Sequence, residues 1–148
     1  MIRNATHDDI PRIVEMAQKF YEQTQHAKHA PMKKECAAGL AIITMQQGTM
    51  LVAEKDGEVV AMLCAFVDHF TFNDEFLMVN ELAFWVDESA RGSSVAVRLL
   101  KEARRVCKAK GVLFFNMAAL ATSPDVTGRI YKAMGLEPIA SIYMQVLS

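Results

Sequence analysis

Two apolar, β-rich runs, 50–54 and 59–66, are separated by four residues that include Asp56-Gly57. An Asp-Gly pair between apolar runs favours a tight hairpin turn, because both residues tolerate the positive φ angles that such turns need. The pattern therefore predicts two neighbouring antiparallel strands. After a loop around 71–74, a long and largely buried third strand is predicted over 76–86.

Helices and further strands surround this meander. Thr6 and Asp9 form a capping-box pattern, and apolar residues then recur at helical spacing from Ile10 to Tyr21. The other predicted helices cover 33–47, 92 or 93 to 110, and 124–134, and the other predicted strands cover 2–5, 112–117 and 139–147. Strand–helix–strand units after a meander predict an α/β (α+β) fold, in which helices cover both faces of a mixed sheet.

Length and charge limit the class of protein. The 148 residues match one domain, which we expect to span residues 1–148. Sixteen basic and 17 acidic residues leave a net charge of -1, which argues against binding to nucleic acid or to an anionic membrane. No apolar run is long enough to span a bilayer, and the first residues lack a signal-peptide layout. We expect a soluble, cytoplasmic and complete chain.

The cysteines do not form a framework. Cys36, Cys64 and Cys107 are odd in number and far apart, which favours free thiols in a reducing compartment. No pair of ligand-type side chains has a recognisable metal spacing, so we expect no metal site.

The junction between the third predicted strand and the helix that follows it is rich in small residues, which are Gly92, Ser93, Ser94 and Ala96. Small residues let a backbone approach a ligand closely, and a helix N-terminus offers free N–H groups and partial positive charge to an anion such as pyrophosphate. An ordinary loop in which Ser93 or Ser94 caps the helix explains the same residues. Local chemistry leaves both interpretations open.

Four segments together resemble the GNAT superfamily of acetyl-CoA-dependent N-acetyltransferases. The family's pyrophosphate motif, Q/R-x-x-G-x-G/A, is matched at Arg91 and Ala96, whereas Ser94 stands where the first glycine is usual. Residues 130–136 resemble the family's Y-x-x-x-G-F segment, with Leu136 in place of Phe. Residues 1–10 and the strand ending at Val86 resemble the first strand with its capped helix and the strand before the motif. The chain is also similar to short family members encoded by phages and mobile elements.

This resemblance implies a mostly antiparallel sheet that splays between strand 76–86 and strand 112–117, with acetyl-CoA in the wedge. It implies main-chain contacts from Phe84, Trp85 and Val86 and a pyrophosphate cradle made by Arg91, Gly92, Ser93, Ser94, Val95 and Ala96. Arg91 either pairs with a phosphate or is a solvated arginine. Asn116 lies amid an apolar strand, where it either binds ligand or satisfies a bulge.

Two residues are candidates for proton transfer. The resemblance places Tyr131 where the family often uses a tyrosine to protonate the departing thiolate; the alternative is a core tyrosine that caps a carbonyl. Glu81 interrupts an apolar strand, and burial would raise its pKa toward neutrality and make it a better base. The alternative for Glu81 is a buried carboxylate paired with Arg or Lys.

Looser candidates surround the expected acceptor site. His26 and His29 fall in a loop that the family uses near the acceptor, and His69 is a further candidate. If the hairpin folds over the acceptor, its mouth is lined by Asp68, Phe70, Phe72 and Asp74.

The expected function is direct transfer of an acetyl group from acetyl-CoA to a primary amine, of a small molecule or a protein, in a ternary complex. A direct route is expected because no cysteine occupies a motif position where a covalent carrier would sit. The main alternative is a degenerate acyl-CoA-binding sensor or scaffold without turnover, for which Ser94 is the best support. A protein-binding module without catalysis is a third hypothesis, and a homodimer is left open.

Overall fold

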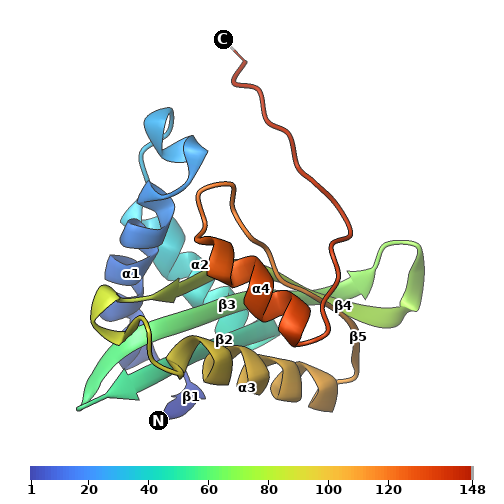
Figure 1. Cartoon of the computed structure of the whole chain (residues 1–148), viewed down its shortest axis with the longest axis horizontal. Coiled ribbons are helices and arrows are strands. Elements are labelled where there is room, and N and C mark those ends of the chain that lie inside the picture. The colour runs from blue at the N-terminus through green and yellow to red at the C-terminus, as the bar shows by residue number, and fades with distance from the viewer. Residues whose placement is uncertain (148) are drawn as a thin grey trace.

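A five-stranded sheet organises the computed structural model, which describes residues 1–147 (Figure 1). Its order is β1-β2-β3-β4-β5. The first four strands pair antiparallel and β5 runs parallel to β4, which confirms a mixed, mostly antiparallel sheet. The strands are β1 (Ile2–Asn4), β2 (Gly48–Lys55), β3 (Glu58–Phe70), β4 (Asn73–Val86) and β5 (Val112–Asn116).

The hairpin between β2 and β3 turns at Asp56 and Gly57, which have φ angles of 53° and 81°. These are the positive values that the Asp-Gly pair predicts. β3 and β4 are both longer than their apolar runs, because ladder hydrogen bonds continue where one face of an antiparallel pair meets water.

Two helix layers cover the sheet. The helices are α1 (Ile10–Glu22), α2 (Lys34–Gln47), α3 (Val95–Ala109) and α4 (Asp125–Ala133), with 3-10 turns η1 (His7–Asp9), η2 (Gln25–Lys28) and η3 (Glu88–Ala90). Met16 of α1 and Ala41 of α2 pack with Val52 on one face. Leu99 and Leu100 of α3 pack with Leu51 and its neighbours on the other face. Successive residues of β2 thus face opposite layers, and truncating such a buried leucine to alanine costs about 2–5 kcal/mol.

An ion-pair network holds the N-terminal strand and the first helix together. Asp9 accepts a hydrogen bond from the Thr6 amide at 2.8 Å, which confirms the capping box. Arg3 donates to Asp9 at 2.7 Å and to Glu54 of β2 at 2.6 Å. The hydrogen bond from Arg3 lowers the pKa of Asp9 to about 2.

The strand predicted over 139–147 is wrong for this structure. Residues 137–147 are exposed and form neither helix nor strand, and the chain runs away from the body after α4 (Figure 1). The alternating pattern is present, but a strand forms only when its backbone pairs with another strand, and these residues have no such partner within 1–147. Within residues 1–147, no helix has the length and apolar character needed to cross a membrane.

Candidate active site

β4 and β5 form a fork. Their parallel pairing runs from Leu77 opposite Val112 to Asn80 opposite Asn116 and ends there. β4 nevertheless continues to Val86, still paired with β3 on its other edge. Residues 81–86 therefore offer main-chain N–H and C=O groups that have no strand partner on the β5 side. This is the splay that the resemblance implies, and an extended ligand can pair there as an added strand.

Asn116 lies at the base of the fork. Its Nδ2 donates to Oδ1 of Asn80 at 3.1 Å, directly where the two strands separate. The side chain of Asn116 is therefore engaged with its neighbouring strand. The structure thus gives Asn116 a bonding role between the strands, whereas the register shift of this pair lies at Leu113, which has no partner on β4.

A β-bulge in β4 sets which residues face the fork. Glu81 pairs with Ala65 and Ala83 pairs with Cys64, so Leu82 is an extra residue without a partner on β3. The bulge shifts by one residue the alternation of side chains between the two faces of the sheet. After it, Phe84 packs with the α3 layer, whereas Ala83 and Trp85 pack with the α1 and α2 layer. Glu81 shares the α3 and α4 face with its partner Ala65. Sequence reasoning missed this bulge, although the break in apolar alternation at Glu81-Leu82 is its signal.

Glu81 is the first residue beyond the base of the fork. Burial raises its pKa to about 7, and the Ala118 amide and the Tyr131 hydroxyl oppose part of that rise. Within residues 1–147, no Lys or Arg forms an ion pair with Glu81, so the paired-carboxylate alternative does not apply. A carboxyl group with a pKa near neutrality can both accept and return a proton.

Tyr131 comes from α4 and packs against the cluster on the α3 face. Its hydroxyl donates to the carbonyl oxygen of Ala118 at 2.8 Å. Burial and the nearby Glu81 carboxyl raise the pKa of Tyr131 well above its usual value. The structure therefore places Tyr131 beside Glu81, and the tyrosine hydroxyl stays protonated. The bond to Ala118 is also the carbonyl cap expected of a core tyrosine.

The small-residue turn leads from η3 into α3. The positive φ angle of the turn is taken by Gly92, at 81°, whereas Ser94 has a φ of -80° and adopts it without strain. Ser94 is the residue before α3, which begins at Val95, two or three residues later than predicted. The amides of Ala96 and Val97 have no acceptor within residues 1–147, so they are free for an anion.

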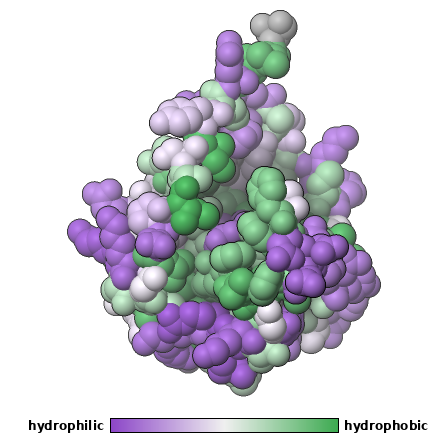
Figure 2. All heavy atoms as spheres, turned by 90° about the vertical axis from the view of Figure 1, so that its right-hand side faces the viewer, coloured by the Kyte–Doolittle hydropathy of each residue, from purple (hydrophilic) through white to green (hydrophobic). Residues whose placement is uncertain are grey.

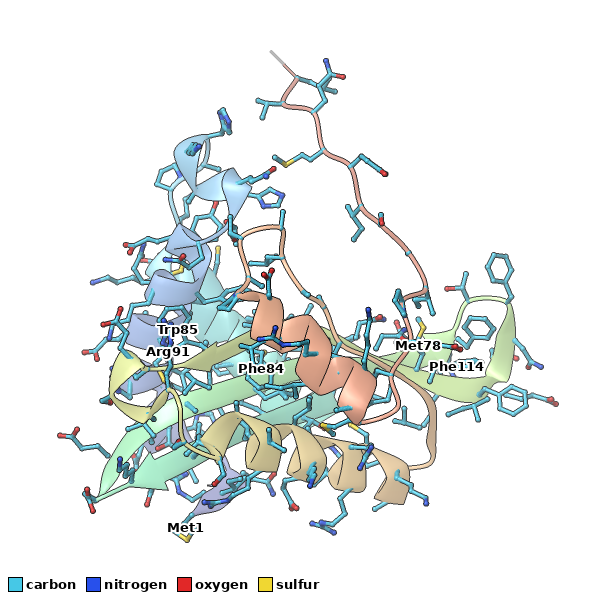
Figure 3. The ribbon with its side chains drawn as sticks, viewed as in Figure 1. Met1, Met78, Phe84, Trp85, Arg91 and Phe114 are labelled. Carbon is cyan, nitrogen blue, oxygen red and sulfur yellow. The ribbon has the colours of Figure 1, made fainter. Side chains whose placement is uncertain are left out.

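Arg91 lies against the end of β4 (Figure 3). Its Nε donates to the carbonyl oxygen of Val86 at 2.9 Å, and its guanidinium carbon is 4.7 Å from the centre of the Trp85 ring. Trp85 Nε1 in turn donates to Asp87 at 2.8 Å, and Asp87 pairs with Arg12 of α1. The Arg91 side chain is thus fixed by β4, while its exposed nitrogen atoms remain close to the turn.

The aromatic residues of the β3–β4 turn lie at the other end of β4. Figure 3 shows Met78 and Phe114 there, far from Trp85 and Arg91. The Phe70 ring packs on Phe114 with 4.9 Å between centroids, and His69 Nδ1 is 2.9 Å from the Asp74 carbonyl oxygen. The structure therefore does not bring Asp68, His69, Phe70, Phe72 and Asp74 to the fork, because the hairpin projects away from it.

The loop after α1 contacts the loop after β5. Thr122, in the loop after β5, donates from Oγ1 to the Gln23 carbonyl oxygen at 2.6 Å. His26 lies in η2 and His29 directly follows it, so both belong to this loop. Within residues 1–147, no group of His, Cys, Asp or Glu side chains is arranged to hold a metal ion.

Comparisons with known proteins agree with this geometry. Residues 10–127 match the model of the acetyltransferase (GNAT) family. No curated protein matches the chain. A predicted acetyltransferase from Clostridium acetobutylicum, solved with acetyl-CoA, is 12% identical with a TM-score of 0.77, and the match covers 99% of this chain and 95% of that chain.

Two further solved structures have the same fold. An aminoglycoside 6'-N-acetyltransferase from Acinetobacter haemolyticus is 15% identical with a TM-score of 0.72, and the match covers 100% of this chain and 98% of that one. An integron cassette protein from the mobile metagenome of Cole Harbour Salt Marsh is 18% identical with a TM-score of 0.75, covering 99% and 90%. With a family match over residues 10–127 and a sheet that forks beside a small-residue turn, the chain belongs to the GNAT acetyltransferase family.

Proposed function

We propose that this protein transfers an acetyl group from acetyl-CoA directly to a primary amine, and that Glu81 and Tyr131 move the protons. One observation carries the proposal: a carboxyl group with a pKa of about 7 lies beside a protonated tyrosine hydroxyl, directly beyond the base of the fork. A site with these two groups can deprotonate an ammonium and assist a leaving thiolate.

The backbone supports binding of the donor. The free edge of β4 at Phe84, Trp85 and Val86 can pair with the amide groups of a pantetheine arm, whatever the side chains there. The turn from Arg91 to Ala96 offers small residues, free amides at the start of α3 and the positive end of the helix dipole to the pyrophosphate. Acetyl-CoA, when bound, supplies the thioester that the amine attacks.

Glu81 acts first in the proposed reaction. Its carboxylate accepts a proton from the acceptor ammonium, either directly or through water, and the free amine then attacks the thioester carbonyl. A pKa near 7 suits this role, because much of the group is ionised at neutral pH while its basicity exceeds that of an ordinary glutamate. The new bond is the amide C–N bond, and the bond that breaks is the C–S bond.

Tyr131 acts next, from its position beside Glu81. Its hydroxyl turns from the Ala118 carbonyl to the sulfur and gives a hydrogen bond to the departing thiolate. Because the pKa of Tyr131 is raised, complete transfer of its proton is uphill, and the proton that Glu81 has taken can replace it. The thiolate takes up this proton and leaves as CoA-SH. The nitrogen loses its second proton as the amide forms, and this proton passes to water through the Glu81 carboxylate, so Glu81 ends in its ionised form and one proton is released overall.

The acceptor remains a primary amine of either a small molecule or a protein. The loops after α1 and after β5, which the Thr122–Gln23 hydrogen bond joins, would line the acceptor side of the fork. Cys36, Cys64 and Cys107 are all free thiols, which supports a cytoplasmic setting as part of the proposal.

The testing experiment measures binding and turnover separately. Acetyl-CoA at 100 times its Kd should add about 2.7 kcal/mol to the free energy of unfolding, visible as a rise in Tm. A panel of polyamines, aminoglycosides, amino acids and peptides should then release thiol with at least one member. Binding without release across the panel would favour the sensor alternative, and no Tm shift with millimolar acetyl-CoA would overturn the assignment.

A further inference from the structure

Asp87 connects the end of β4 to helix α1. It directly follows β4 and is only 8% exposed. One carboxylate oxygen accepts a hydrogen bond from the Trp85 indole N–H at 2.8 Å, and the other pairs with the guanidinium of Arg12. Lys19 of α1 adds a second cation, with its Nζ 3.5 Å from the carboxylate. The Asp87 side chain therefore joins one aromatic ring of the sheet to two charges of the helix.

The Asp87 side chain is ionised and fixed in place. Burial alone would raise its pKa, but the hydrogen bond from Trp85 and the charges of the two cationic partners together lower it. The Asp87 amide donates to the Val60 carbonyl oxygen at 2.8 Å, and the Asp87 carbonyl oxygen accepts from the Ala90 amide at 2.9 Å. A buried carboxylate with this many partners has little freedom to move. The N–H edge of the indole is thus held by a rigid acceptor.

The face of the same indole carries Arg91. The guanidinium carbon is 4.7 Å from the ring centre, and Nε donates to the Val86 carbonyl oxygen at 2.9 Å (Figure 3). A planar guanidinium stacks on an aromatic face, which the ammonium group of a lysine cannot do. The Arg91 side chain therefore folds back on β4 and closes the loop of residues 86–91, immediately before the small-residue turn.

We propose that Trp85 and Asp87 are positioning residues that hold Arg91 across the start of the turn, so that the pyrophosphate cradle of residues 91–96 is preformed. The inference rests on the proposed function, because it assumes that this turn binds the pyrophosphate of acetyl-CoA. A flexible arginine loses side-chain freedom when it joins a binding site, and a ring that fixes it beforehand removes this loss from the binding step. Asp87 contributes by fixing the ring.

The contacts of these side chains make the proposal specific. Trp85 packs against the cluster on the α1 and α2 face, and Asp87 is enclosed by its partners. Their side chains therefore act on the turn through Arg91. It follows that removing the indole should weaken donor binding only while Arg91 is present.

The first measurement is the fluorescence emission of Trp85, which is the single tryptophan of the chain. Arg91→Ala should change this emission in the free protein, because it removes a cation from the indole face. The control is Arg105→Ala, which removes an exposed arginine from α3 on the opposite face of the sheet and should leave the emission unchanged. Unchanged emission in Arg91→Ala would show that the stack does not persist in solution and would overturn the proposal.

The second measurement is calorimetric titration with two donors. Acetyl-CoA contains the pyrophosphate, whereas acetyl-pantetheine has the same thioester arm without it. We expect Trp85→Leu to raise the Kd of acetyl-CoA about tenfold, and Trp85→Phe, which keeps an aromatic face, only about threefold. Asp87→Asn should raise this Kd about threefold, since the amide still accepts the indole N–H but no longer pairs with the cations of α1. The Kd of acetyl-pantetheine should stay within about twofold for all three variants.

Arg91→Ala supplies the background that separates positioning from packing. It should raise the Kd of acetyl-CoA by at least as much as Trp85→Leu does, and adding Trp85→Leu to it should change the Kd by no more than about twofold. Far-UV circular dichroism checks that each variant is folded at the titration temperature. If Trp85→Leu does not fold, Asp87→Asn with and without Arg91→Ala gives the same comparison.

Phe72→Leu is the matched control for loss of an aromatic ring. Phe72 is 90% exposed in the β3–β4 turn, at the other end of β4 from the stack. Figure 2 views the molecule from the side where this turn projects and shows apolar side chains gathered there. We expect Phe72→Leu to leave the Kd of acetyl-CoA within about twofold.

The outcomes separate this inference from the proposed function. If the wild type does not bind acetyl-CoA, the proposed function fails and the inference fails with it. If the wild type binds but Trp85→Leu adds its full loss to that of Arg91→Ala, Trp85 acts by packing and only the inference is overturned. An equal loss of affinity for both donors, or an unchanged affinity in Trp85→Leu or Arg91→Ala, overturns the inference in the same way.

Discussion

Asn116 closes the fork between β4 and β5 by donating from Nδ2 to Oδ1 of Asn80 at 3.1 Å. The bond lies at the last register pair of the two strands, so it sets the point from which they diverge. Glu81 is the next residue of β4, and its distance from β5 therefore depends on where the fork begins.

Replacing either asparagine by alanine should weaken acetyl-CoA binding. Loss of one hydrogen bond of about 1 kcal/mol predicts a Kd about fivefold higher, because the fork is then less well ordered. Asn80→Ala, Asn116→Ala and the double variant should bind almost equally, since each removes the same bond. Calorimetric titration measures this, and additive effects of the two single changes would show that the side chains act separately.

Glu81→Gln tests the base. We expect turnover to fall by about 100-fold near neutral pH with acetyl-CoA affinity almost unchanged, because the amide keeps the shape but accepts no proton. The wild-type rate should rise with pH through about 7, where Glu81 ionises, and the variant should lose that inflection. A variant that retains both its rate and the inflection would assign the pH dependence to another group.

The same residue predicts how stability changes with pH. The pKa of Glu81 is raised from 4.5 to about 7 in the folded chain, so the folded state binds more protons than the unfolded state between these values. The contribution of Glu81 to the free energy of unfolding should therefore decline as pH rises from about 4.5 to about 7 and stay level above that. Urea titrations of the wild type and Glu81→Gln across this range should show the decline only in the wild type.

Tyr131→Phe removes one hydroxyl and keeps the ring that packs against the α3 face. We expect turnover to fall between about 10-fold and 1,000-fold, with recovery for thioesters that have better leaving groups. The Ala118 carbonyl loses its donor, so the free energy of unfolding should drop by about 1 kcal/mol. An equal loss of rate across leaving groups would mean that Tyr131 only shapes the pocket.

The turn before α3 offers a matched pair of changes. Gly92 has a positive φ with nothing within 4 Å of an added Cβ, so Gly92→Ala introduces strain alone, about 1 kcal/mol. Ser94→Gly should leave acetyl-CoA affinity unchanged within about twofold, because Ser94 already has a negative φ. Differential scanning fluorimetry with acetyl-CoA measures both variants, and a large gain from Ser94→Gly would show that the serine side chain obstructs the ligand.

Local patterns predicted much of this structure. The Asp56-Gly57 turn, the capping box at Asp9 and the apolar periodicity of α1 and α3 act over a few residues, so they are visible in the sequence. Glu81 stood out because a carboxylate in an apolar strand needs an explanation, and its raised pKa has the cause expected from burial. The junction at Gly92 and Ser94 was recognised through its small residues.

Features that depend on pairing between distant segments could not be predicted in this way. The register that ends at Asn80 and Asn116 and the contact between Glu81 and Tyr131 arise from tertiary geometry. The segment 139–147 has strand propensity, but propensity does not supply a partner edge. The expected lining of the acceptor mouth by Phe70 and Phe72 did not anticipate the direction in which a long hairpin points.

Because of the bulge at Leu82, the geometry of the site depends on the number of residues in β4 as well as on their identities. Loss of the Leu82 codon alone would restore regular pairing between β3 and β4. Either Glu81 would then turn away from the face that carries Tyr131, or Phe84 and Trp85 would exchange layers. A deletion of three nucleotides would thus turn either Glu81 or both Phe84 and Trp85 to the opposite face of the sheet.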